Sequence, residues 1–333
     1  MSNNAIKVIF LGTPVFSVPI LEALIADPSI EILVVGTPPD KPAGRGQKLT
    51  PPAIKKRAEE AGLTVYQTKS IRKDETLQKT LDNLNPDFFV TIAFGQILSQ
   101  EVLDIPKLGT VNVHASLLPE LRGANPIQWA ILHNKTQTGI TTMLTDIGVD
   151  TGDMLLKEMI EIAPDDTLLS LTIKLSQAGG PLLIKTLKGM ASGSITPEAQ
   201  DHDAATPAPK CDKNADIIDW EKDAQTVHNQ IRAFNAGVAF LQMPDGSQQR
   251  MKLSDSRISE ENLKTATPGQ VLGNIKAADD SVCLHIATGN GAVSITRIQP
   301  DGKRAMPVSD WLNGIGLQAE QLRFLPSSTL TLR

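Results

Sequence analysis

The chain has 333 residues, of which 41% are hydrophobic and 21% charged, and its formal net charge is −5. This is the ordinary mix of a folded globular protein, so the composition excludes an intrinsically disordered chain, and the length predicts two domains. Two cysteines, Cys211 and Cys283, are too few for a disulfide framework or a four-cysteine zinc site. The sequence contains no stretch of about 18 apolar residues, which is the length that a membrane-spanning helix needs. We therefore expect a cytoplasmic protein with no membrane partner.

The first half of the chain alternates short apolar runs with helical patterns. The expected elements, in chain order, are strand Ile6–Leu11, helix Pro19–Ala26, strand Ile32–Gly36, helices Ala53–Ala61 and Thr76–Leu84, strands Phe88–Ala93, Thr110–His114, Gly139–Leu144 and Met154–Ile162, and helix Leu168–Leu187. Such alternation predicts an α/β domain with a doubly wound, mostly parallel sheet. We place this domain at residues 1–189.

A change of pattern separates this domain from the rest of the chain. Residues 190–209 are rich in Ala, Ser, Gly, Thr and Pro and have no apolar periodicity, which is typical of a linker. After a helical segment at Ala224–Phe234, short apolar runs alternate with turn signals such as Pro244-Asp245-Gly246 and Pro300-Asp301-Gly302. This spacing predicts a small β-barrel in a second domain at residues 210–333.

The turn Gly12-Thr13-Pro14 follows the first expected strand, where nucleotide-binding folds place a glycine-rich loop. No G-x-G-x-x-G pattern follows, and Pro14 lacks the backbone N–H that a pyrophosphate site would use. We interpret the segment as an ordinary end of a strand.

Asn112 and His114 stand two residues apart in the expected strand Thr110–His114. Residues with that spacing project to one face of a strand, so the amide and the imidazole point together at its carboxyl end, where α/β sheets bind ligands. A histidine at a strand end is more often a structural residue, so this pair alone leaves both interpretations open.

The acidic segment Asp146–Asp153 has three aspartates and two glycines in eight residues. It lacks the longer ligand series ending in Glu that a calcium loop requires. A solvated turn is one interpretation. In the other, Asp150 lies beside His114, orients its ring and helps to move protons.

An amide, an imidazole and a carboxylate together suit the attack of an amine on a carbonyl or formyl carbon. The amine is itself the nucleophile, so no catalytic Ser or Cys is needed. Asn112 and His114 would stabilise the negative charge that develops on the oxygen, a contribution of about 2.7–4 kcal/mol for each donor of this kind. The five histidines show no metal-ligand spacing, and we expect no metal.

At these residues the sequence resembles the methionyl-tRNA formyltransferase family over residues 6 to 325. Seven motifs carry the resemblance in order: Phe10–Pro14, Pro39–Gly46, Asn112–Pro119, Arg122–Ala124 with Pro126–Gln128, Asp146–Asp153, Ile231–Asn235 and Ala287–Gly291. The resemblance implies a formyltransferase-like Rossmann fold, a C-terminal OB-like barrel, and transfer of a formyl group from the co-substrate 10-formyltetrahydrofolate to the α-amine of methionyl initiator tRNA. It also implies that Asn112, His114 and Asp150 are catalytic.

The resemblance further implies folate and tRNA contacts. The implied folate residues are Phe94, Gly95, Ile97, Leu98, Ser116, Leu117, Leu118, Pro119, Ile147, Gly148 and Val149. The segment Lys41–Arg57 has six basic residues and no acidic one, which suits phosphate binding. A solvated loop with no binding role can have the same composition. The implied tRNA residues are Lys41, Arg45, Lys48, Arg122, Lys210, Arg232, Lys303 and Arg304. We expect the protein to act as a monomer.

Some positions depart from the family pattern. Ala115 stands where a glycine is usual, and Asn235-Ala236-Gly237-Val238 lacks the usual proline and tryptophan. The first change leaves the proposed triad intact, whereas the second weakens the inference of detailed tRNA contacts in the second domain.

Three alternatives stay open at this point. Glycinamide ribonucleotide formyltransferases share the Asn, His and Asp core but lack the barrel and the basic segment. Amino-sugar formyltransferases share more but usually continue into a dehydrogenase domain. A non-catalytic RNA-binding protein would not need Asn112, His114 and Asp150 together.

Overall fold

The computed structural model describes residues 5–44, 46–243, 245–259, 266–276 and 281–329. The chain divides into two units. Unit 1 contains the described residues of Met1–Pro126, Gln137–Glu161 and Thr172–Pro209. Unit 2 contains those of Ile127–Thr136, Ile162–Leu171 and Lys210–Arg333.

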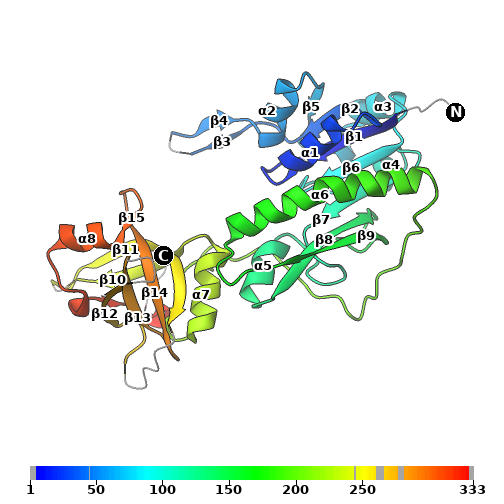
Figure 1. The fold of residues 1–333 in the computed structure, drawn as a ribbon. Helices are drawn as coiled ribbons and strands as arrows, with labels where there is room; N and C mark the ends of the chain where they lie inside the picture. Colours follow the sequence, from blue (N-terminus) through cyan, green and yellow to red (C-terminus); the bar gives the residue numbers. More distant parts are fainter. Residues whose placement is uncertain (1–4, 45, 244, 260–265, 277–280, 330–333) are drawn as a thin grey trace. The chain divides into compact units, whose positions relative to one another are not determined.

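Unit 1 is built on a seven-stranded sheet with the order β5-β2-β1-β6-β7-β8-β9 (Figure 1). Its strands are β1 (Ile6–Gly12), β2 (Ile30–Thr37), β5 (Val65–Gln67), β6 (Phe88–Ile92), β7 (Thr110–His114), β8 (Gln137–Leu144) and β9 (Met154–Glu161). The neighbours from β5 to β7 are parallel, whereas β8 is antiparallel to both β7 and β9. The chain adds strands on one side of β1 and then on the other, which confirms the predicted doubly wound, mostly parallel sheet.

The helices of unit 1 pack on this sheet. They are α1 (Ser17–Ala26), α2 (Ala53–Glu60), α3 (Glu75–Asn83), α4 (Gln100–Leu103), the 3₁₀ turn η1 (Ile71–Lys73) and, from Thr172 onward, the long α6 (Leu168–Ala191). Figure 1 shows α6 lying along the sheet. A Cβ at Gly179 would lie 2.8 Å from Cδ1 of Ile20, and one at Gly180 would lie 2.5 Å from Cβ of Ala23. These two glycines therefore let α6 approach α1 closely.

The basic segment contains a β-hairpin that the sequence analysis did not predict. Strands β3 (Lys41–Ala43) and β4 (Lys48–Thr50) pair antiparallel, with Lys41 opposite Thr50. Each strand has three residues and β3 includes a proline, so neither gives the period-2 pattern that identifies strands in a sequence.

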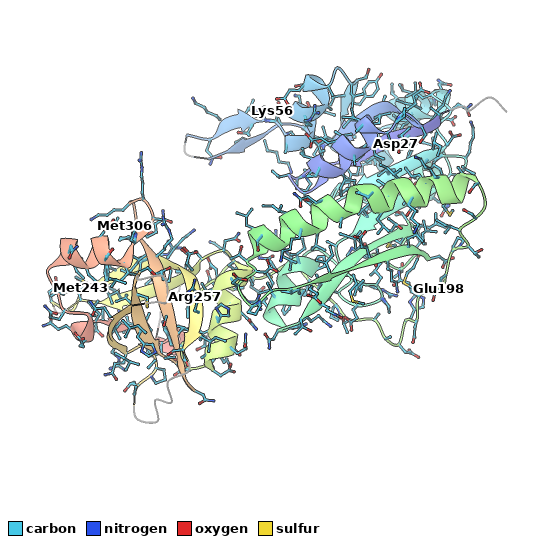
Figure 2. All side chains as sticks on the ribbon, viewed as in Figure 1. Asp27, Lys56, Glu198, Met243, Arg257 and Met306 are labelled. Atoms are coloured by element: carbon cyan, nitrogen blue, oxygen red, sulfur yellow. The ribbon has the colours of Figure 1, made fainter. Side chains whose placement is uncertain are left out.

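Residues 190–209 form an ordered part of unit 1. Helix α6 continues to Ala191, and Glu198 then pairs with Met154 at the start of β9 through two backbone hydrogen bonds of 2.8 Å. Further on, the backbone of Arg122 bonds to Thr206 and Ala208. We call residues 198–208 the strap; Glu198, at its start, is labelled in Figure 2. Single bridges of this kind leave no periodic pattern, so the composition suggested a linker.

Unit 2 contains a curled antiparallel sheet with the order β12-β13-β14-β11-β10-β16, and β15 pairs with β14. Its strands are β10 (Gly237–Gln242), β11 (Gln248–Ser259), β12 (Val271–Lys276), β13 (Val282–Ala287), β14 (Ala292–Pro300), β15 (Met306–Pro307) and β16 (Arg323–Phe324). Gln270, directly before β12, bridges to Arg323 in β16, so the two edges of the sheet meet and close a barrel. This confirms the predicted C-terminal β-domain.

The helices of unit 2 are α7 (Ala224–Ala233), α8 (Val308–Ile315), the 3₁₀ turns η2 (Ala319–Gln321) and η3 (Ser327–Thr329), and α5 (Pro126–Leu132) from Ile127 onward. Trp220 and Phe324 lie in the apolar interior of the barrel with their ring centroids 5.5 Å apart. No helix in the described ranges of either unit is long and apolar enough to cross a membrane.

Candidate active site

The candidate site lies at the carboxyl end of β7, in the sheet of unit 1. This strand is parallel to β6 and antiparallel to β8, so both of its edges are paired. Asn112 and His114 project to one face of it, as the alternation of a strand requires. His114 is only 6% exposed, and Asn112 is half-buried. Because the ring of His114 is so shielded from water, its polar atoms must find partners within the protein.

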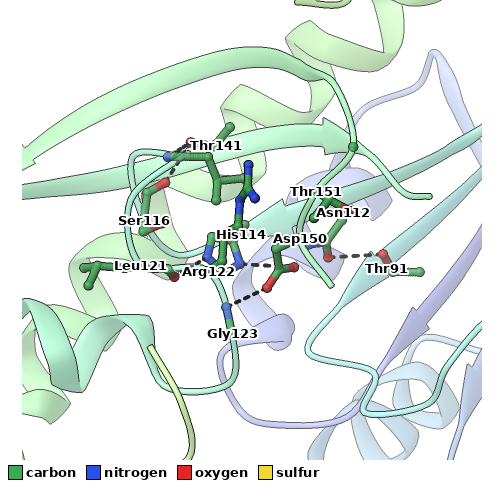
Figure 3. Close-up of polar contacts among 12 residues, drawn as sticks. Thr91, Asn112, His114, Ser116, Leu121, Arg122, Gly123, Thr141, Asp150 and Thr151 are labelled. Carbon is green, nitrogen blue, oxygen red and sulfur yellow. Dashed lines mark hydrogen bonds and ion pairs between the residues drawn. The ribbon is translucent and has the colours of Figure 1, made fainter. Parts of the chain in front are cut away.

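Both ring nitrogens of His114 face defined groups (Figure 3). Nε2 lies 3.0 Å from the carbonyl oxygen of Leu121, and Nδ1 lies 3.6 Å from Oδ1 of Asp150. A carbonyl oxygen can only accept, so Nε2 is the nitrogen that donates. Nδ1 is therefore the only ring nitrogen left for chemistry, and it lies on the side of Asp150.

Asp150 is held by one backbone group and one side chain. The Gly123 N–H donates to Oδ2 of Asp150 at 2.9 Å, and Nε2 of Gln200 donates to the Asp150 carbonyl oxygen, also at 2.9 Å. The other carboxylate oxygen, Oδ1, faces His114. The carboxylate is thus oriented toward the imidazole, as the sequence analysis predicted for these two residues.

Asn112 is oriented by the neighbouring strand. Oγ1 of Thr91 in β6 donates to Oδ1 of Asn112 at 3.1 Å. With its oxygen end at Thr91, the amide has Nδ2 as the end that can donate to a ligand. Figure 3 shows Asn112, His114 and Asp150 in the same region of unit 1.

Three non-glycine residues near these side chains have backbones in the left-handed region. The φ angles are 59° for Leu121, 53° for Asp150 and 45° for Ala93, which directly follows β6. Such conformations cost about 1–3 kcal/mol each and tend to occur at functional sites. Both residues that face the nitrogens of His114 are therefore held in costly conformations.

The segment that carries Asp150 is folded by its own side chains. Asp146 accepts hydrogen bonds from the Gly148 N–H at 3.0 Å and from Oγ1 of Thr151 at 2.8 Å. Within the described ranges, no group of three or more His, Cys, Asp or Glu side chains has an arrangement that could hold a metal ion.

Several of the predicted folate residues are exposed around this site. Ile97, Ile147 and Val149 are 66%, 74% and 70% exposed, and Gly95 and Gly148 are exposed as well. Leu117 and Pro119 are half-buried. Exposed aliphatic side chains on loops next to polar groups are suited to cover an apolar part of a ligand.

Four other predicted folate residues have buried side chains: Phe94, Leu98, Ser116 and Leu118. Leu118 packs with Met143 and Met154, and the hydroxyl of Ser116 donates to the carbonyl oxygen of Glu120 at 2.6 Å. Phe94 and Leu98, which follow β6, belong to the hydrophobic core. These four side chains support the loops from within, so any contact of these residues with folate would be made through their backbone; their assignment to the folate site stays a prediction.

The predicted tRNA residues differ in how accessible they are. Five are exposed: Lys41 and Lys48 in unit 1, and Lys210, Lys303 and Arg304 in unit 2. Arg45 lies outside the described residues. The exposed lysines of the hairpin are free of the sheet core and can meet a phosphate.

Arg232 needs correction as a tRNA contact. It is 5% exposed, its Nε and Nη2 donate to Oδ1 of Asn229 at 3.1 and 2.9 Å, and its Nη1 donates to the Asp166 carbonyl oxygen at 3.0 Å. Burial also lowers the pKa of its guanidinium. Arg232 therefore stabilises unit 2 from inside.

Arg122 likewise has partners within its own unit. Its Nε and Nη2 donate to Oε1 of Gln200 at 3.0 and 2.7 Å, and Nη1 lies 3.2 Å from Nδ1 of His202.

The sequence analysis missed Gln200, which lies next to the candidate site, and missed the backbone groups of Leu121 and Gly123. A lone glutamine in a stretch without periodicity gives no signal, and neither does a backbone group.

Comparison with known proteins places the chain among formyl transferases. Residues 6–187 match the family described as Formyl transferase, and residues 210–316 match the Formyl transferase C-terminal domain. The chain is 42% identical over 308 residues to the methionyl-tRNA formyltransferase of Trichlorobacter lovleyi, covering 92% of this chain and 94% of the relative. It is also 42% identical over 314 residues to that of Bacillus licheniformis, with 94% and 96% covered.

Solved structures share the fold at lower identity. An N-formyltransferase from Helicobacter canadensis, in complex with folinic acid and dTDP-3-aminofucose, has a TM-score of 0.62 and 19% identity, covering 89% of this chain and 99% of that one. HypX from Aquifex aeolicus, in complex with tetrahydrofolic acid, has a TM-score of 0.57 and 17% identity, covering 93% of this chain and 47% of that one.

Proposed function

This chain belongs to the methionyl-tRNA formyltransferase family, and we propose that Asn112, His114 and Asp150 carry the formyl transfer that it performs. The reaction forms an amide between a formyl group and the amine of methionyl initiator tRNA. The 42% identity to methionyl-tRNA formyltransferases over 92–94% of the chain favours this activity over the amino-sugar alternative, whose solved structure is only 19% identical.

The arrangement of His114 is the observation that carries the proposal. Its ring is fixed between the carbonyl oxygen of Leu121 and the carboxylate of Asp150, and Asn112 shares its strand face. A purely structural histidine does not need a carboxylate beside its second ring nitrogen, yet Asp150 lies 3.6 Å from Nδ1. Asp150 also adopts a left-handed backbone conformation, which costs free energy. This geometry supports a role in proton transfer.

In the proposed mechanism the neutral amine attacks the formyl carbon and negative charge develops on the formyl oxygen. Nδ2 of Asn112 donates to that oxygen, and Nδ1 of His114 donates when the ring is protonated. Because both ring nitrogens of His114 then carry a proton, the Asp150 carboxylate accepts the proton lost by the amine and returns it to the donor nitrogen. The bond from carbon to the donor nitrogen then breaks, and that nitrogen takes up a proton as it leaves.

We propose 10-formyltetrahydrofolate as the formyl donor. The folate ligands of two structures with the same fold support this assignment. The exposed side chains of Ile97, Ile147 and Val149 offer apolar contacts for the pterin on loops beside the polar groups.

We also propose that the hairpin β3–β4 and the second domain, residues 210–333, contact the tRNA. The exposed Lys41 and Lys48 supply positive charge on the hairpin, and Lys210, Lys303 and Arg304 supply it in unit 2. The monomeric state and the cytoplasmic location stay predictions.

The proposal is tested by steady-state kinetics of Asn112→Ala, His114→Ala and Asp150→Asn with methionyl-tRNA and the folate donor. We expect each to lower kcat by about 100- to 1,000-fold, the range for removal of one group that stabilises a transition state. His133→Ala is the matched control, because His133 is an exposed histidine of unit 2. Activity near that of the control in either the His114 or the Asp150 variant would show that the pair does not carry the reaction.

A further inference from the structure

The strap holds together the two segments that fix His114. One segment, at Leu121–Gly123, supplies the carbonyl that faces Nε2 of His114 and the N–H that faces the Asp150 carboxylate. The other segment carries Asp150 itself. The strap reaches both, because its backbone and Thr206 bond to the first and Gln200 bonds to the second.

Within the strap, the side chain of Gln200 makes several of these hydrogen bonds at once. It is 5% exposed, and its Nε2 donates to the carbonyl oxygens of Asp150 at 2.9 Å and of Gly152 at 2.7 Å. Its Oε1 accepts from Nε and Nη2 of Arg122 at 3.0 and 2.7 Å. Both donor hydrogens and both lone pairs of the amide are thus used.

The position of these bonds ties Gln200 to the carboxylate and not merely to the fold. Asp150 is held with φ at 53°, which its own backbone does not favour, so outside contacts must maintain it. Gln200 bonds to the carbonyl of that residue and to the carbonyl two residues later. A shift here moves the carboxylate relative to Nδ1 of His114.

We propose that Gln200, backed by Arg122, is a positioning residue for the Asp150 carboxylate. This inference rests on the proposed roles of His114 and Asp150. It also assigns the guanidinium of Arg122 to the site in place of a tRNA phosphate. Misplacement of a reacting group by about 1 Å can cost on the order of 100-fold in rate.

The test uses Gln200→Ala and Gln200→Glu in the full chain. Glutamate retains an acceptor for Arg122 but places an oxygen against two carbonyls. We expect both variants to lower kcat by about 10- to 100-fold and to leave the KM for folate and for tRNA within about twofold. An effect of general unfolding would not spare KM in this way and would show in the thermal melting curve.

Gln230 provides the matched control in unit 2. Its Nε2 donates to the carbonyl oxygens of Ala215 at 2.9 Å and Ile217 at 2.6 Å, and its Oε1 accepts from the Asp219 N–H at 3.1 Å. Gln230→Ala and Gln230→Glu lose similar bonds, so we expect lower melting temperatures with kcat within about twofold of the wild type.

Three results would overturn the inference: unchanged kcat in the Gln200 variants, an equal loss in the Gln230 variants, or failure of both Gln200 variants to fold. The last would assign Gln200 to folding alone. His114→Ala and Asp150→Asn are measured in parallel. If those two variants stay active, the proposed site itself is wrong; if they are inactive while the Gln200 variants are not, only the role of Gln200 is wrong.

Discussion

The ring of His114 has one nitrogen available for chemistry, and the surrounding backbone decides which one. Nε2 is engaged by the Leu121 carbonyl, so in the proposed mechanism the formyl group approaches Nδ1, on the side where Asp150 lies. At this scale the enzyme depends less on which side chains it has than on how their neighbours orient them. Gly123 is the clearest example.

Gly123→Ala is expected to disturb the site without touching a catalytic side chain. Gly123 has φ at 124°, and a Cβ there would lie 2.6 Å from the carbonyl oxygen of Ala208 in the strap. Because its N–H donates to Asp150, relief of the clash moves that donor away from the carboxylate. We expect kcat to fall by about tenfold or more and the stability to fall by about 1–3 kcal/mol, measured by steady-state kinetics and urea unfolding.

The control for this prediction is Gly62→Ala. Gly62 also has a positive φ, at 73°, but a Cβ there would meet no atom within 4 Å. The variant should therefore lose stability through backbone strain and keep its kcat. Equal kcat values for the two variants would contradict the role assigned to Gly123.

The sequence predicts the proposed catalytic side chains and not their supports, for a physical reason. Asn112 and His114 were found because a strand alternates its faces. Asp150 was found because a carboxylate in a loop after a neighbouring strand can face the histidine and because the family resemblance points to it. Gln200 acts from 50 residues beyond Asp150, through backbone carbonyls that every residue type possesses. The burial of the Phe94 and Leu118 side chains was not predicted either, because a family motif marks a segment without saying which of its side chains point inward.

At the scale of elements, the hairpin β3–β4 owes its position to a small polar cluster at its base. Nζ of Lys55 lies 3.0 Å from Oδ1 of Asp40, and Nε2 of Gln67 donates to the same oxygen at 2.9 Å and to the Pro38 carbonyl at 2.8 Å. Hydrogen bonds from Gln67, and then from Lys55, hold the pKa of the Asp40 carboxyl below its ordinary value. The cluster fixes where the exposed lysines of the hairpin are presented.

Gln67→Ala is expected to loosen the hairpin while leaving the active site intact. A hairpin that is less ordered before binding pays more entropy when it meets the tRNA, so we expect the KM for methionyl-tRNA to rise by about 3- to 10-fold. The KM for the folate should stay unchanged. Gln78→Ala is the control, since Gln78 also donates to a backbone carbonyl, that of Ile71, at 2.7 Å. A parallel rise in both KM values would indicate a general defect.

At the scale of the whole molecule, the chain builds unit 2 from three separate stretches. Residues 127–136 and 162–171 belong to it although the sequence analysis placed them in the first domain. Their membership depends on contacts between distant residues, such as the bond from Gln128 to the Ala233 carbonyl at 3.2 Å and that from Arg232 to the Asp166 carbonyl at 3.0 Å. Local patterns predicted the sheet and the barrel, whereas these long-range bonds leave no local pattern.

The stability of unit 2 should depend on pH through one of these contacts. His228 is buried; its Nε2 lies 2.9 Å from the Pro164 carbonyl oxygen and its Nδ1 lies 2.8 Å from Oγ of Ser256. Burial lowers the pKa of its imidazole below the ordinary 6.5, and the nearby charge of Arg232 lowers it further, against the opposite effects of the Pro164 carbonyl and Asp165. The unfolded chain therefore takes up a proton that the folded chain resists.

The sign follows from this difference in proton binding. Stability due to neutral His228 is fully present above the unfolded pKa of about 6.5 and is lost as the pH falls through that value toward the lower folded pKa, by at most about 1.4 kcal/mol per pH unit. Urea unfolding between pH 7.5 and 5.5 should show this loss, reduced in His228→Gln, whose amide cannot titrate. The other histidines and the carboxylates are common to both proteins, so the difference between the two curves isolates His228. Parallel curves would show that its protonation is not linked to folding.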